Sequence, residues 1–178
     1  MIHRLIQTVS LSGTRQQRLA FFADGNVYVS TYSTGTGLQA PVLASGGQGV
    51  YGATDYPHAA QVSGPGKVYF VAPGEDIQLL NTATGAIEAY AASAGTAPTD
   101  GTICCIYRNR RIVSGQAASP QNFYASRSGD VTDWDYAQQD PQAAFAGNAA
   151  TLPDIIVSLV PFAQDQLVIG CERSLHRM

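Results

Sequence analysis

A hairpin pattern that recurs four times along the 178-residue chain limits its possible folds more than any other feature. Each copy consists of an apolar run, a short polar turn and a second apolar run, and the copies span 18–30, 58–72, 103–115 and 158–170. Equivalent positions just after the turns hold Val27, Val68, Ile112 and Leu167. These positions are roughly 40 to 55 residues apart, which is the length of one four-stranded blade of a β-propeller. The period therefore predicts a propeller-type fold.

The residues at the four turns support strands over helices. The turns are Asp24-Gly25-Asn26, Gly64-Pro65-Gly66, Arg108-Asn109-Arg110 and Gln164-Asp165-Gln166. Several of these residues tolerate positive φ or bond their own backbone, as tight reversals require. The chain also has 18 Gly and 9 Pro, and its apolar runs are short and rich in β-branched or aromatic residues, which favours strands and disfavours long helices. We expect an all-β protein.

The second half of each repeat should supply the two outer strands of its blade. The run 76–90 predicts such a pair on either side of 82–85. In the third repeat, 122–126 and 134–137 are the predicted outer strands, and 137–154 reads as an insertion. The first repeat is looser, with a turn at 34–37 and a crossing loop at 45–58.

The repeats divide a single predicted domain, 1–178, into blades at about 16–57, 58–101, 102–154 and 155–178. The last of them stops where its third strand should form, around 174–178. A propeller of three to four blades leaves two flanks open, because each blade buries its faces against its neighbours. We therefore expect the fold to be completed by further chain or by partner subunits.

Composition and charge exclude several function classes. The formal net charge of −3 gives no basic field, which makes nucleic-acid binding improbable as the main role. No run of about 18 apolar residues and no secretory signal pattern is present, so no membrane association is expected. The three cysteines, Cys104, Cys105 and Cys171, form neither a disulfide framework nor a zinc pattern. They are expected to be small buried hydrophobes, and no cofactor is predicted.

One short segment, Ser126-Arg127-Ser128-Gly129-Asp130-Val131-Thr132-Asp133-Trp134, has the properties of a structural loop. Its glycine and first aspartate allow the backbone to reverse, and the Asp and Thr side chains can bond the free amides. The tryptophan can anchor the returning strand. The expected structural residues are Ser126, Gly129, Asp130, Asp133 and Trp134.

A cation site is the alternative for the same loop. It would be built from Asp130, Asp133 and Asp135, because Ca²⁺ takes several oxygens from one short loop. The full Ca²⁺-loop pattern, with a glycine turn between the acids and a later bidentate Glu, is absent.

The chain has one basic cluster, formed by Arg108, Arg110 and Arg111 with Arg127 nearby. A solvated hairpin tip is the first expectation for these side chains. The alternative is that they contact acidic groups of a neighbouring subunit or the phosphates of DNA in a channel.

The stretch 107–178 resembles a family of bacteriophage tail-associated or tail-nozzle propeller proteins. The resemblance rests on an Arg-rich hairpin, YRNRRIVSG, on the segment SRSGDVTDW, and on a later Gly-x-Glu-x-Ser-Leu motif at 170–175. The first half of the chain is similar to the same family more loosely, through strand pattern. The resemblance implies a structural virion protein of the tail, nozzle or head–tail junction, assembled in the host cytoplasm as a ring of copies. Its implied partners are other tail or head–tail proteins, with possible contact to genomic DNA in the tail channel.

The rival interpretation is a receptor-binding or glycan-processing, sialidase-like propeller. In the Asp-box turn of such enzymes an Asp precedes the Gly, whereas here Gly129 precedes Asp130. Glycoside hydrolysis needs two carboxylates across a cleft, and most acids of this chain fall at predicted turns or strand ends. Exposed rings such as Tyr32, Tyr51 and Tyr56 are candidates for contact with a glycan or with a protein partner. The sequence predicts a protein that is not an enzyme.

Overall fold

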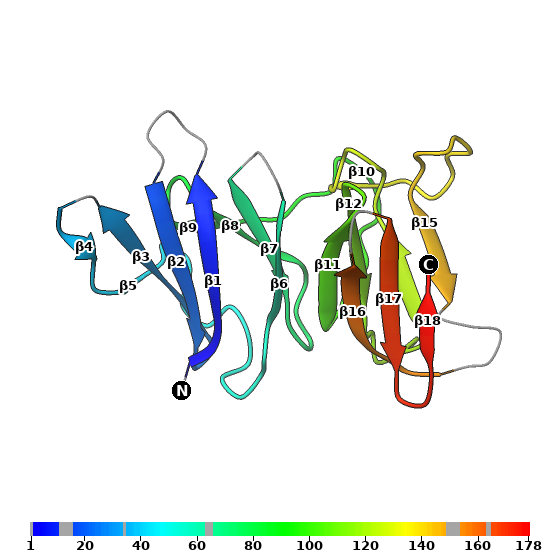
Figure 1. Ribbon diagram of the computed structural model, residues 1–178, viewed down its shortest axis with the longest axis horizontal. Helices are drawn as coiled ribbons and strands as arrows, with labels where there is room; N and C mark the ends of the chain where they lie inside the picture. The colour runs from blue at the N-terminus through cyan, green and yellow to red at the C-terminus, as the bar shows by residue number, and fades with distance from the viewer. Residues whose placement is uncertain (1, 11–15, 34, 63–65, 149–153, 163–164) are drawn as a thin grey trace. The chain divides into compact units, whose positions relative to one another are not determined.

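The computed structural model describes the whole chain except residues 1, 11–15, 34, 63–65, 149–153 and 163–164. All regular elements of the described residues are β-strands, and they form several small, mainly antiparallel sheets (Figure 1). The all-β prediction is therefore confirmed. The expected turns at Gly64-Pro65 and Gln164, and the position of Thr34, lie outside the described residues.

The chain divides into two compact units, 1–90 and 91–178. Each unit has a hydrophobic core of its own, shared by two main sheets, and unit 2 also contains a small two-stranded sheet.

The first sheet of unit 1 is built around a long antiparallel hairpin. Its strands are β1 (Ile2–Ser10), β2 (Gln16–Ala23), β3 (Asn26–Ser33) and β4 (Gly37–Leu38), with β5 (Val42–Leu43) also paired to β3. The β2–β3 turn has positive φ at Asp24 (50°) and Gly25 (78°), as expected for a two-residue turn that follows strand twist. The sheet begins at Ile2, well before the first predicted blade boundary at residue 16, because β1 pairs along β2.

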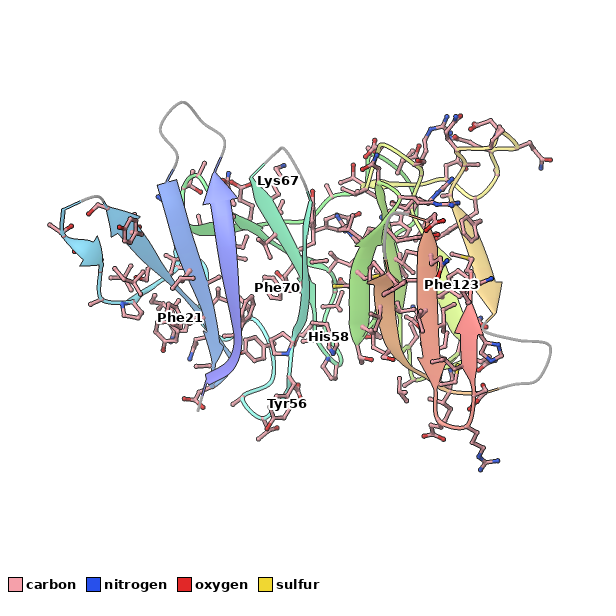
Figure 2. The ribbon with its side chains drawn as sticks, in the orientation of Figure 1. Phe21, Tyr56, His58, Lys67, Phe70 and Phe123 are labelled. Carbon is pink, nitrogen blue, oxygen red and sulfur yellow. The ribbon has the colours of Figure 1, made fainter. Side chains whose placement is uncertain are left out.

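The second sheet of unit 1 is a four-stranded antiparallel meander. Its strands are β6 (His58–Val62), β7 (Lys67–Val71), β8 (Gln78–Asn81) and β9 (Ala86–Glu88). The predicted hairpin at 58–72 and the predicted strands on either side of 82–85 are both confirmed. The two sheets share one core, in which the rings of Phe22 and Phe70 meet edge to face with centroids 5.1 Å apart. Figure 2 shows Phe70 inside this core, and Phe21 on the opposite side of β2.

The first main sheet of unit 2 has the order β11-β12-β13-β15. Its strands are β11 (Ile103–Tyr107), β12 (Arg110–Ser114), β13 (Asn122–Ala125) and β15 (Phe145–Asn148). The predicted hairpin at 103–115 and the strand near 122–126 are confirmed.

The predicted fourth strand of this sheet, 134–137, is wrong. Asp133 and Trp134 form β14, which pairs in parallel with β10 (Ala94–Gly95) in a separate two-stranded sheet. The fourth position is taken by β15, from the segment that was expected to be an insertion. The physical reason is that Trp134 is fully buried beside the Arg111 guanidinium and its backbone pairs with Gly95, so β14 is not available as an edge strand for β13.

The last sheet of unit 2 contains β16 (Ile156–Phe162), β17 (Gln166–Cys171) and β18 (Leu175–Arg177). A third strand was predicted at the end of the chain, and β18 confirms it. Buried side chains of this sheet, such as Leu159, Leu167 and Ile169, join those of β11–β13 in one core.

The sheets differ in how their faces are covered. Successive residues Val68–Val71 of β7 and Arg111–Ser114 of β12 are all buried. Because successive residues of a strand point to opposite faces, both faces of these strands are covered. In contrast, β3 and β16 each carry exposed large side chains, including Tyr32 and Phe162.

Candidate functional site

The Arg-rich hairpin and the Ser126–Trp134 loop meet in unit 2, and together they form the candidate site. The tip of the hairpin is a two-residue turn with positive φ at Arg108 (47°) and Asn109 (57°). Arg110 already belongs to β12 and pairs with Tyr107. The predicted turn is therefore confirmed, and both of its central residues are exposed.

Ser126 joins the loop to the hairpin. Its side chain is fully buried, and its Oγ accepts the backbone N–H of Arg111 at 2.9 Å. Its own N–H donates to the Arg111 carbonyl at 2.9 Å, and its carbonyl accepts Nη1 of Arg110 at 2.8 Å. One serine thus satisfies several polar groups in a place that excludes water.

The turn after Ser126 is closed by Gly129 and Asp130. Gly129 has φ 86°, and its N–H donates to the Asn109 carbonyl at 3.0 Å. Oδ1 of Asp130 accepts the N–H and Oγ–H of Thr132 at 2.9 and 2.6 Å, and Oδ2 accepts Oγ–H of Ser93 at 2.9 Å. Burial raises the pKa of the Asp130 carboxyl, but these hydrogen bonds outweigh it and leave the pKa below its ordinary value.

Trp134 ends the loop as a buried anchor. Its side chain is 0% exposed, and the Arg111 guanidinium lies 5.9 Å from its ring centroid. Its backbone pairs with Gly95, where a Cβ would come within 2.1 Å of the Trp134 carbonyl oxygen. Sequence analysis missed Gly95 and Ser93, because both are far from the loop in sequence and belong to no recognisable motif.

All four arginines of the basic cluster make contacts inside unit 2, and they differ in how far they are exposed. Arg111 is 0% exposed. Arg110 donates to the carbonyls of Ser126, Ala143 and Pro141 and lies over the Phe145 ring, and burial is the main cause that lowers its pKa.

Arg127 and Arg108 complete the set. Arg127 forms an ion pair with Asp140 at 2.8 Å, a hydrogen bond that raises the Arg127 pKa, and it also bonds Gln138. Arg108 is exposed at the tip, where its guanidinium lies 5.4 Å from the Tyr107 centroid and donates to the Asp165 carbonyl. Arg108 is therefore the member of the cluster most available to a partner.

The three acids proposed as a cation site are used by the loop itself. Oδ1 of Asp133 accepts the N–H of Asp135 at 2.9 Å, and Oδ1 of Asp135 accepts the N–H of Ala137 at 3.0 Å. With Asp130 bonded as described above, each carboxylate caps a turn. Within the described part of the chain, no group of three or more His, Cys, Asp or Glu side chains is arranged to hold a metal ion.

An open depression of about 490 Å³ lies beside the loop. It is lined by Arg110, Tyr136, Gln138, Gln139, Asp140, Pro141, Ala143, Ala144, Phe145 and Ala146. The guanidinium of Arg110 donates to three carbonyls, and two of them, those of Pro141 and Ala143, belong to residues that line the depression. Arg110 therefore helps to hold the 136–146 segment in place.

A second polar cluster joins the start of β16 to the β17–β18 turn. Oγ of Ser174 lies 2.6 Å from Oδ2 of Asp154 and 2.8 Å from Nε2 of His176. The hydrogen bond from Ser174 is the main cause that keeps the pKa of the Asp154 carboxyl below its ordinary value.

Ser174 donates its single hydroxyl proton to the Asp154 carboxylate, so a histidine nitrogen that bonds the same Oγ does so as the donor. Ser174 is the serine of the Gly-x-Glu-x-Ser-Leu motif, and its hydrogen bond to Asp154 links the β17–β18 hairpin to the start of β16. The motif was recognised in the sequence, but this contact was not, because Asp154 lies 20 residues away.

The cysteines were expected to be small buried hydrophobic residues. Cys104 and Cys105 are buried and Cys171 is half-buried, all three as free thiols; burial raises the pKa of Cys105 to about 12.

Tyr32 and Tyr56 are exposed as expected, but Tyr51 is only 3% exposed. Tyr51 packs on Phe22, and burial raises its pKa to about 12, which removes it from the candidates for glycan contact.

No protein-family model matches the chain, and no curated protein matches it. The described part of the chain also contains no helix that is long and apolar enough to cross a membrane.

Proposed function

We propose that the chain is a structural protein of a bacteriophage tail, nozzle or head–tail junction, with the sheets acting as propeller blades. The observation that carries the proposal is the internal bonding of the Ser126–Trp134 loop. Both acids of this motif cap turns, the side chain of Ser126 is buried and accepts the Arg111 N–H, and Trp134 is buried. The polar side chains of this loop therefore form hydrogen bonds that stabilise the loop itself, and they are not free to bind a substrate.

The order of the strands supports the propeller part of the proposal. Two of the sheets are four-stranded and consist of strands that follow each other closely in sequence, β6–β9 and β11-β12-β13-β15. A propeller blade is such a four-stranded antiparallel unit, repeated along the chain. The last sheet, β16–β18, fits the first three strands of another blade.

The partners in this role are other tail or head–tail proteins and further copies of the chain. Contact with DNA in a tail channel is a secondary possibility that falls on Arg108, the exposed arginine of the hairpin tip. The overall net charge of −3 disfavours DNA as the main partner.

Immunogold electron microscopy of the encoding phage tests the proposal. Antibodies against the chain should label the tail or neck of intact particles, and the purified chain should release no reducing sugar from bacterial surface glycans. Particles without label, or glycan hydrolysis that is lost when a carboxylate is substituted, would overturn it in favour of a soluble or glycan-processing protein.

A further inference from the structure

The exposed large hydrophobic side chains of the described residues are concentrated on two sheets. The β1–β5 sheet carries Tyr32, Leu38, Val42 and Leu43, and the β16–β18 sheet with its flanks carries Ile155, Val157, Val160, Phe162, Leu175 and Met178. The sheets β6–β9 and β11-β12-β13-β15 carry none of them, and the two others, Tyr56 and Tyr136, lie in loops.

Strand register places many of these side chains on one face of each sheet. In β1–β5, the pairs Phe21–Tyr28, Tyr28–Leu43 and Tyr32–Leu38 share the face opposite to the core residues Phe22 and Val27. We call this the β1–β5 outer face, and Figure 2 shows Phe21 on it.

The corresponding surface of unit 2 is the β16–β18 outer face. It contains Val160, Phe162, Val168, Leu175 and Arg177, because Val160 pairs with Val168 and Val168 with Arg177. Leu159 and Ile169 alternate with them and point into the core. Phe162 is 62% exposed and Leu175 75% exposed.

We propose that these two faces bind each other between copies, the β1–β5 outer face of one copy covering the β16–β18 outer face of a second copy. This inference deepens the proposed structural role, on which it rests, by naming the partner and the surfaces. Such a head-to-tail contact is heterologous, so it builds rings or filaments and not only closed pairs.

The available area fits a protein interface. Each outer face has three large apolar side chains that are about half or more exposed: Tyr32, Leu38 and Leu43 on one, and Val160, Phe162 and Leu175 on the other. At roughly 100 Å² for each side chain they supply about 300 Å² of apolar surface per face, and the partly exposed Phe21, Tyr28 and Val168 add to it. A standard interface buries about 800 Å² per partner, and about 57% of that is apolar, or about 450 Å². Each outer face therefore offers most of the apolar area that one partner of a stable contact needs.

The charges and rings on the two outer faces favour contact between the two different faces over contact of either face with itself. The β16–β18 outer face carries the cation of Arg177, and a two-fold pairing of this face with itself would bring two such cations into one apolar interface. The β1–β5 outer face instead offers the rings of Phe21, Tyr28 and Tyr32, on which a guanidinium can stack. The stacked sheets within each unit show that sheets of this chain already pack face to face.

Two blocked variants test the inference in the full chain. Tyr32→Glu with Leu43→Glu blocks the β1–β5 outer face, and Val160→Glu with Phe162→Glu blocks the other. These side chains are at least 45% exposed, so both variants should fold, which circular dichroism and Trp134 emission verify. Tyr56→Glu, in a loop and 63% exposed, is the matched control.

Sedimentation velocity gives the readout. The wild type and Tyr56→Glu should form dimers and larger species as concentration rises, whereas each blocked variant alone should stay monomeric, with its self-association weakened at least tenfold. An equimolar mixture of the two blocked variants should form dimers and nothing larger, since each retains one complementary face.

Two outcomes overturn the inference. One is a wild type that stays monomeric, and the other is a blocked variant that self-associates as the wild type does. If a blocked variant self-associates as the wild type does, the proposed structural role is unaffected, but the two outer faces are not the surfaces through which copies bind. Loss of that role would appear instead as unlabelled particles in the microscopy experiment.

Discussion

Ser126 shows how one residue can fix a loop, because its buried hydroxyl is the acceptor for a backbone N–H of the neighbouring strand. Ser126→Ala leaves the Arg111 N–H without that acceptor in a site that water does not reach. We expect a loss of about 1–3 kcal/mol in the free energy of unfolding, the cost of an unsatisfied buried donor. Urea denaturation followed by Trp134 fluorescence measures it.

The matched control is Ser128→Ala two residues away. Its Oγ donates to the Arg108 carbonyl at 3.3 Å in an exposed setting, so its loss should change stability by less than about 0.5 kcal/mol. Equal effects of the two substitutions would mean that the Ser126 joint does not hold the loop.

Asp130 should make the stability of the protein depend on pH. Its folded-state pKa lies below the ordinary value, so its stabilising effect is fully present above about pH 4 and is lost as the pH falls through the folded pKa. Asp130→Asn should therefore destabilise the protein at pH 7, and the difference from wild type should shrink below about pH 4. Denaturation series at several pH values measure the difference.

The hydrogen-bond donors of Asp130 provide the control. Ser93→Ala removes one donor to the carboxylate, and should raise the pKa of Asp130 and shift the loss of stability to higher pH. A difference between wild type and Asp130→Asn that stays constant from neutral to acidic pH would contradict this role.

At the scale of elements, the parallel pair β10–β14 depends on the close approach of Gly95 to Trp134. Gly95 has φ 67°, and a Cβ there would lie 2.1 Å from the Trp134 carbonyl oxygen. Gly95→Ala should therefore cost about 2–3 kcal/mol and separate the pair. Because Trp134 is the single tryptophan of the chain, a red shift of its emission reports the separation directly.

Gly129→Ala separates the effect of φ from the effect of crowding. Gly129 has φ 86°, but no atom lies within 4 Å of its would-be Cβ. This substitution should cost only about 1–2 kcal/mol and leave the emission maximum unchanged. An unshifted emission in Gly95→Ala as well would show that β10 does not position the tryptophan.

The elements that sequence could predict are those whose signal is local. The hairpins at Asp24-Gly25 and Arg108-Asn109 carry their turn residues between two apolar runs, and both are present. The mistake at 134–137 arose because the alternating sequence Trp-Asp-Tyr-Ala has the pattern of an edge strand. Its real partner, Ala94–Gly95, is set by a long-range contact, which no local pattern encodes.

The candidate site follows the same rule. The structural role expected for the Ser126–Trp134 loop agrees with its hydrogen bonds, because Asx-type caps join residues two positions apart. The internal contacts of Arg110 and Arg127 could not be inferred from the sequence, since their partners Ala143 and Asp140 lie in a different segment. The prediction of a solvated hairpin tip rested on the charge of these arginines alone.

At the scale of the whole molecule, the salt dependence of self-association distinguishes the outer faces from the arginine tip. Apolar burial is not screened by salt, whereas contacts of an exposed cation such as Arg108 weaken once the Debye length falls to about 10 Å near 0.1 M salt. We expect association of the wild type to persist or strengthen between about 0.05 and 0.5 M NaCl, and to weaken on cooling, as apolar contacts do. Sedimentation equilibrium measures both trends. Arg108→Ala should then associate as the wild type does, and an association that salt abolishes and Arg108→Ala removes would assign the contact to the hairpin tip and its charge.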